Sequence, residues 1–229
     1  MKPSLFQPRQ VDIPPALVLI PYFPQAALFN DLQKKALRRQ NFLHSCLLWF
    51  ENMAIISGFI GYPHLLTLLQ RIAGLDGKEI YFLGSAGALQ PRFREPATLQ
   101  VGEIRPGSHF KRFSRSRALK LKPFGGDAFP VVSGVSVDII QRETPTWLAE
   151  QRALKTGIVE MELFPLRWFL GKPFYALVVL SDQVQQTGIR PFREKDKFNN
   201  EFQRAFQAII REIDHEKSDP DPSLSRRSR

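Results

Sequence analysis

Residues 157–182, GIVEMELFPLRWFLGKPFYALVVLSD, combine a helix pattern with a very apolar strand. Two carboxylates, Glu160 and Glu162, precede an apolar helical run that ends at a Gly-Lys-Pro break. The strand that follows is apolar enough to be buried on both faces, and it ends in Ser181 and Asp182. Strands of this kind are typical of an α/β sheet covered by helices on both sides.

Strand and helix patterns alternate along the rest of the chain. Apolar runs bounded by turn residues predict strands within 16–20, 45–58, 79–83, 97–113 and 129–140. Amphipathic spacing and capping residues predict helices after residue 25, from Pro63, over 144–154 and over 194–213. The sequence therefore predicts an α/β fold with a central mixed, mostly parallel twisted sheet and helices on both faces.

Composition predicts one domain. We expect an extended N-terminal arm over 1–15, a single α/β domain over 16–216 and a disordered basic tail over 217–229. The N-terminal residues lack the apolar core of a signal peptide, and no segment has the pattern of a membrane span. The single cysteine, Cys46, excludes an intrachain disulfide, so a cytoplasmic location is expected.

Three segments are predicted to meet at one edge of the sheet. Ligands of open α/β sheets collect outside the carboxyl ends of the strands. Three segments point to this edge. They are the Gly-Ser-Ala-Gly segment expected to form a turn after Leu83, the residues around 133–137, and the pair Ser181 and Asp182 at the end of the last strand. This edge is the candidate site, and no metal site or cofactor is predicted there.

The residues alone leave the role of Asp182 open. An aspartate at the end of a buried strand can cap the following turn, or desolvation can raise its pKa and make it a proton donor. Glu162 likewise suits either a helix start or a binding role. Nucleotide-binding glycine loops, the esterase G-x-S-x-G motif and zinc motifs are all absent from the sequence.

Five short motifs occur together in one order. They are YFLGSAGAL (81–89), LQVGEI (99–104), VVSG (131–134), VEMELF (159–164) and FYALVVLSD (174–182). In order and approximate spacing they resemble the nucleoside phosphorylase and nucleosidase superfamily, with methylthioadenosine/S-adenosylhomocysteine nucleosidases the most similar branch. The resemblance runs from about Ala16 to Ile213 and implies cleavage of the N-glycosidic bond of a purine-type nucleoside by water or phosphate.

The resemblance also implies roles for individual residues. Asp182 would be the general acid on the leaving base, and Glu162 would bind the ribose hydroxyls. Substrate contacts would come from Gln25, Gly84, Ser85, Ala86, Val137, Met161 and Ser181. Members of the family complete their sites across an interface, so a homodimer is expected.

Several positions depart from the family pattern. Gln25 and Ala26 stand near the position where the hydrolytic branch has a glutamate that activates water. Phe82 replaces an arginine that holds phosphate in the phosphorolytic branch, and Val137 replaces an aromatic residue that stacks on the base. An anion site would then depend on other arginines, of which the candidates are Arg105, Arg112, Arg115 and Arg117.

Two alternatives follow from these departures and from the charge. Without the glutamate, the chain would be a catalytically weak or inactive nucleoside-binding protein that keeps the fold and the pocket. The net charge of +10 raises the alternative of a polyanion-binding module, but the sequence offers few aromatic residues among the basic ones. Nucleic acid and membrane partners are therefore not expected, and the expected partner is a small-molecule nucleoside, with or without phosphate.

Overall fold

Two long apolar strands, β5 (Glu79–Ala88) and β10 (Tyr175–Gln185), form the centre of the molecule. They pair in parallel from Tyr81 opposite Tyr175 to Ala88 opposite Gln183. The computed structural model describes residues 11–42, 44–107, 117–125, 129–138 and 144–218. The predicted terminal arm and tail lie largely outside these ranges.

The remaining strands extend this pair in two directions. They are β1 (Ala16–Ile20), β2 (Arg38–Asn41), β3 (Cys46–Trp49), β4 (Met53–Ser57), β6 (Thr98–Pro106), β7 (Leu119–Lys120), β8 (Val131–Ser136), β9 (Ile158–Glu160) and β11 (Gly188–Pro191). On one side β5 continues through β1, β4 and β3 to β2. On the other side β10, β6, β8, β9 and β5 pair in sequence, and the pairing of β10 with β5 closes them into a barrel.

The predicted mixed sheet is confirmed, and the sheet is not purely parallel. Among the described strands, five pairings are parallel (β1–β4, β1–β5, β5–β10, β6–β8, β8–β9). Six are antiparallel (β2–β3, β3–β4, β5–β9, β6–β7, β6–β10, β10–β11). Short connections such as those between β3 and β4 and between β10 and β11 allow only antiparallel neighbours.

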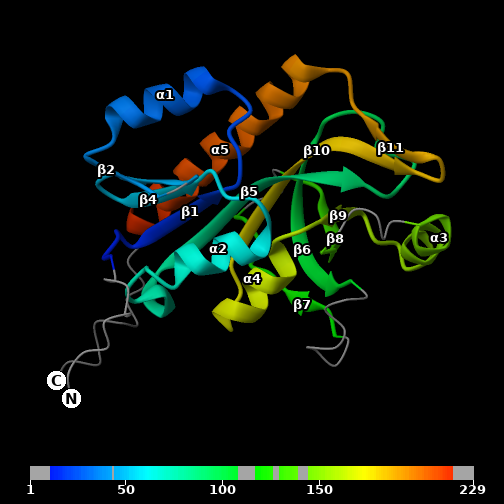
Figure 1. Ribbon diagram of the computed structural model, residues 1–229, viewed down its shortest axis with the longest axis horizontal. Coiled ribbons are helices and arrows are strands. Elements are labelled where there is room, and N and C mark those ends of the chain that lie inside the picture. The colour runs from blue at the N-terminus through cyan, green and yellow to red at the C-terminus, as the bar shows by residue number, and fades with distance from the viewer. Residues whose placement is uncertain (1–10, 43, 108–116, 126–128, 139–143, 219–229) are drawn as a thin grey trace.

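Helices cover both faces of the sheet, as predicted (Figure 1). The helices are α1 (Ala26–Lys35), α2 (Gly61–Leu69), α3 (Pro145–Ala153), α4 (Leu163–Leu170) and α5 (Lys195–Ser218), with a short 3-10 helix at Leu75–Gly77. One apolar cluster packs α2 and α4 against the sheet, and a second packs α1 and α5 against the opposite face. Phe202 and Phe206 of α5 are buried in the second cluster, as their spacing of four predicts.

The Gly-Ser-Ala-Gly segment is part of a strand. It was expected to form a turn, but β5 continues through it to Ala88. Its backbone pairs with β10 on one side and with β9 on the other, so neighbouring strands supply the hydrogen bonds that a turn would otherwise make. The predicted cap of α3 is confirmed, because the Trp147 N–H donates to Thr144 Oγ1 at 3.2 Å.

None of the helices in the described ranges has both the length and the apolar character needed to cross a membrane.

Candidate functional site

A cavity of about 190 Å³ lies where β5, β8, β9 and β10 end, and the three segments predicted to meet do meet there. Its described lining consists of Ser85, Ala86, Gly87, Val137, Val159, Glu160, Met161, Glu162, Ser181, Asp182, Val184 and Ile189. Three of these residues are acids and none is basic. The cavity therefore suits a ligand that presents hydrogen-bond donors.

A β-bulge aims Asp182 at the cavity. The register between β10 and β5 shifts between Leu180 and Asp182, which leaves Ser181 as the extra residue and sets Asp182 opposite Gly87. Ser181 Oγ donates to Asp182 Oδ2 at 2.6 Å. Burial raises the pKa of Asp182, and the hydrogen bond from Ser181 acts in the opposite direction. A raised pKa keeps the carboxyl protonated nearer to neutral pH, as a proton donor requires.

Gly87 leaves the space that the Asp182 carboxylate occupies. A Cβ atom at position 87 would lie 2.8 Å from Asp182 Oδ1 and 3.1 Å from Val159 Cγ1. A side chain at this position therefore has to displace the carboxylate.

The variant Gly87→Ala should lower the activity of the site at least about tenfold, because small displacements of a catalytic group reduce rates strongly. Gly77→Ala is the matched control, since no atom would lie within 4 Å of its Cβ. Activity would be measured as release of free base, with thermal unfolding as a check of the fold. Equal activity of the two variants would contradict the placement of Asp182 in the site.

Glu160 stabilises the turn that carries Met161 and Glu162. Its side chain is buried, and Oε2 accepts hydrogen bonds from the backbone N–H groups of Glu162 (2.6 Å) and Leu163 (2.7 Å). Oε1 is hydrogen-bonded to the hydroxyl of Ser136, and Ser136 Oγ accepts from the N–H of Phe164 at 2.8 Å. The carboxylate thus satisfies free N–H groups at the start of α4 and fixes the backbone on either side of Met161. Burial, and next the charge of Glu162, raise the pKa of Glu160 to about 8.

Glu162 links this turn to α2. Its Oε1 accepts a hydrogen bond of 3.0 Å from the N–H of Gly61, which is the first residue of α2 and has a φ of +68°. A left-handed φ of this kind favours glycine. The pKa of Glu162 is raised above its ordinary value by burial, and the hydrogen bond from Gly61 acts in the opposite direction. Glu162 lines the cavity immediately before α4, and the N–H of Gly61 at the start of α2 orients its carboxylate. Its position therefore depends on both α4 and α2.

The structure brings together most of the predicted site residues. Those that line the cavity are Asp182, Glu162, Met161, Ser181, Ser85, Ala86 and Val137. Gly84 is next to it but not in its lining, and a Cβ there would lie 2.6 Å from Cε1 of Phe82. The buried Phe82 ring therefore packs on the backbone of Gly84, at the position where a phosphate-binding arginine was considered.

Gln25, Arg105 and Arg117 are described by the structure and do not line the cavity. Gln25 precedes α1 as its N-cap residue, and its side chain makes no capping hydrogen bond. Arg105 forms an ion pair with Glu103 at 3.0 Å, and Arg117 is exposed before β7. Arg112 and Arg115 lie outside the described residues. The anion site expected from these arginines thus stays a prediction.

Several lining residues were not assigned to the site from the sequence. Glu160 and Gly87 lie within the motifs VEMELF and YFLGSAGAL, so these motifs were the signal that could have assigned them to the site. Val184 and Ile189 carry no such signal, because they reach the cavity through the antiparallel pairing of β10 with β11.

No protein-family model and no curated protein sequence matches the chain. Solved structures do match it over most of its length. The purine nucleoside phosphorylase of Toxoplasma gondii in complex with immucillin-H is 15% identical, with a TM-score of 0.67 over 93% of this chain and 96% of that chain. The 5'-methylthioadenosine/S-adenosyl homocysteine nucleosidase of Campylobacter jejuni is 14% identical, with a TM-score of 0.65 over 86% and 97%. A futalosine hydrolase mutant of Helicobacter pylori is 14% identical, with a TM-score of 0.64 over 89% and 100%.

Proposed function

We propose that this chain, which has the fold of the nucleoside phosphorylase and nucleosidase superfamily, cleaves the N-glycosidic bond of a purine-type nucleoside. One observation carries the proposal: Asp182, with its pKa raised by burial, shares a cavity with Glu162 and Met161 at the edge where the central strands end. The similar structures are enzymes of this class, and one of them holds the ligand immucillin-H.

The chemistry assigns a different task to each acid. As the bond between the sugar carbon and the base nitrogen breaks, its electron pair moves to the base and positive charge develops on the sugar. Asp182 donates a proton to the leaving base and neutralises it. Glu162 accepts hydrogen bonds from the ribose hydroxyls, and its charge stabilises the cationic sugar. Met161 packs against the sugar or the base.

Water is the acceptor that the described lining favours. Phosphate would meet the acids Glu160, Glu162 and Asp182 without any basic side chain among the described lining residues. The position at which an arginine would hold phosphate carries the buried ring of Phe82. Both observations support hydrolysis over phosphorolysis.

A nucleoside-binding protein without turnover is the second candidate. The observation that favours it is the position of Gln25, which replaces the water-activating glutamate and is absent from the described cavity lining. A glutamine can orient a water molecule but cannot accept its proton at neutral pH.

The test is free-base release, measured by chromatography. The purified protein is given methylthioadenosine, S-adenosylhomocysteine, adenosine, inosine, guanosine and a nucleoside with an acidic 5′ extension, each with and without phosphate. We expect base release without phosphate. Release only with phosphate would overturn the choice of water, and ligand-induced thermal stabilisation without any release would favour the binding protein.

A further inference from the structure

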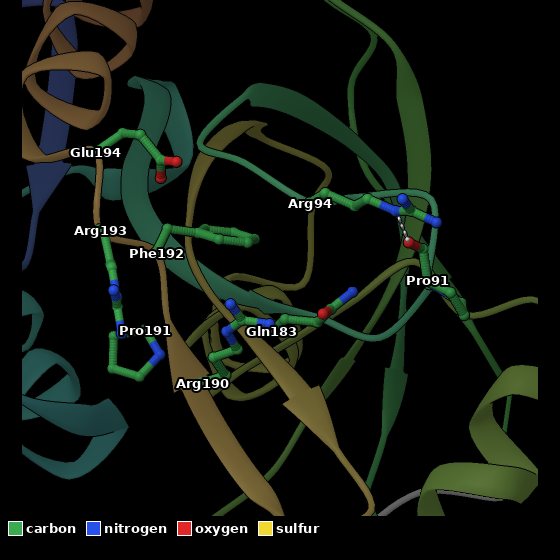
Figure 2. Close-up of a pocket in the computed structure, with 8 residues that line it drawn as sticks. All are labelled: Pro91, Arg94, Gln183, Arg190, Pro191, Phe192, Arg193 and Glu194. Carbon is green, nitrogen blue, oxygen red and sulfur yellow. Dashed lines mark hydrogen bonds between the residues drawn. The ribbon is translucent and has the colours of Figure 1, made fainter.

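A second cavity, of about 490 Å³, lies on the other face of the hairpin formed by β10 and β11 (Figure 2). Asp182 and Val184 of β10 line the candidate active site, whereas Gln183 between them lines this second cavity together with its cross-strand partner Arg190. Because side chains alternate between the two faces of a strand, the hairpin separates the two cavities. The second cavity has no part in the proposed reaction.

Hydrogen bonds and an ion pair hold the walls of this cavity in place. Gln183 Nε2 donates to the carbonyl of Phe93 at 3.0 Å, which joins β10 to the connection between β5 and β6. Lys197 of α5 forms an ion pair of 2.6 Å with Glu95 of the same connection. Thr98 Oγ1 donates to Glu201 Oε2 at 2.7 Å. These contacts join the segments of chain that carry the lining residues.

The cavity carries positively charged side chains that form no ion pair with another described residue. The side chains of Arg190 and Arg193 are exposed and make no hydrogen bond or ion pair with any other described residue. Among the described residues, the Arg94 side chain donates a hydrogen bond to the carbonyl of Pro91 alone, at 3.4 Å. Of the described lining residues, only Glu194 carries an opposing carboxylate.

The apolar part of the lining lies among these arginines. Figure 2 shows the ring of Phe192 extending into the middle of the lining residues, with Arg94 and Arg190 on opposite sides of the ring. Pro91 and Pro191 complete the apolar surface. An aromatic face beside several guanidinium groups matches a ligand with a flat ring and an anionic group.

We propose that this cavity binds a nucleoside phosphate, with the phosphates on the arginines and the base against Phe192. Guanidinium groups bind phosphate oxygens in pairs, and a cavity of this size accommodates a ligand of nucleotide dimensions. The ligand would bind one residue away from Asp182 along β10, although on the opposite face.

Isothermal titration calorimetry with ADP, inorganic pyrophosphate and adenosine tests the proposal. ADP should bind, and saturating adenosine should not displace it. The double variant Arg190→Gln/Arg193→Gln should weaken ADP binding at least tenfold. Lys34→Gln/Arg211→Gln removes the same charge from exposed positions of α1 and α5 and should change it less than twofold. Asp182→Asn should bind ADP as the unchanged protein does, which separates this site from the proposed reaction.

Three results would overturn the proposal. One is the absence of ADP binding at millimolar concentration, and another is equal ADP binding by the two double variants. The third is pyrophosphate binding as tight as that of ADP, which would show that the base makes no favourable contact with Phe192 and that the cavity is a simple phosphate site. Thermal unfolding of each variant checks that the exposed substitutions leave the fold intact.

Discussion

Replacing Asp182 with asparagine should lower base release by a factor of about 10² to 10⁴, the range attributed to general acid catalysis. Asparagine has almost the same shape, and its carbonyl oxygen can still accept the hydrogen bond that Ser181 donates at 2.6 Å. It has no proton to give to the leaving base. The loss should appear mainly in kcat, because the proton is transferred as the bond breaks.

Asp31→Asn is the matched control for this variant. Asp31 is an exposed acid of α1 that pairs with Lys35, and surface pairs of this kind contribute little to stability. Base release by Asp31→Asn should equal that of the unchanged protein. Full activity of Asp182→Asn would show that Asp182 is not the general acid. A lowered unfolding temperature of Asp182→Asn would point to a structural role instead.

The stability of the protein should fall as pH rises from about 5 to 9, and Glu160 should account for a large part of the fall. Its pKa is raised from 4.5 to about 8 in the folded state, so the folded protein holds a proton that the unfolded chain has lost. The stabilisation is complete below pH 4.5 and is lost as pH rises through 8. The limiting slope is about 1.4 kcal/mol per pH unit.

Glu160→Gln isolates this contribution. Glutamine resembles the protonated acid, because its oxygen can accept from the N–H groups of Glu162 and Leu163 while its NH₂ donates to Ser136. Urea unfolding at several pH values should give a flatter profile for this variant than for the unchanged protein. Glu51→Gln, at an exposed position, should leave the profile unchanged. Parallel profiles for all three proteins would mean that Glu160 does not titrate in this range.

Local signals were sufficient for the parts of the fold that depend on neighbouring residues. Thr144 followed by Pro145 predicts the start of α3, and the apolar run after Lys172 predicts β10. The meeting of Ser85, Val137 and Asp182 follows from the rule that ligands collect where the strands end. These inferences need only residue order and the regular geometry of helices and strands.

Long-range pairing was the part that the sequence pattern did not contain. Closure of the barrel depends on the pairing of β10 with both β5 and β6, and no local motif specifies two partners for one strand. The three residues of β9 are too few to show a period. The role of Glu160 depends on backbone N–H groups and on Ser136, which lies 24 positions away in the sequence. The position of Gln25 away from the described cavity lining likewise depends on how the chain turns after β1.

The bulge at Ser181 has a consequence for anyone who compares this chain with more distant relatives. A strand has only two faces, so one additional residue transfers every later side chain to the opposite face. A homologue that lacks this residue can be aligned with its acid beneath Asp182, column for column, and still direct that acid to the opposite face of the strand, the face on which Gln183 lies. Percent identity in this region therefore says less about shared chemistry than the presence or absence of a single gap immediately before the aspartate.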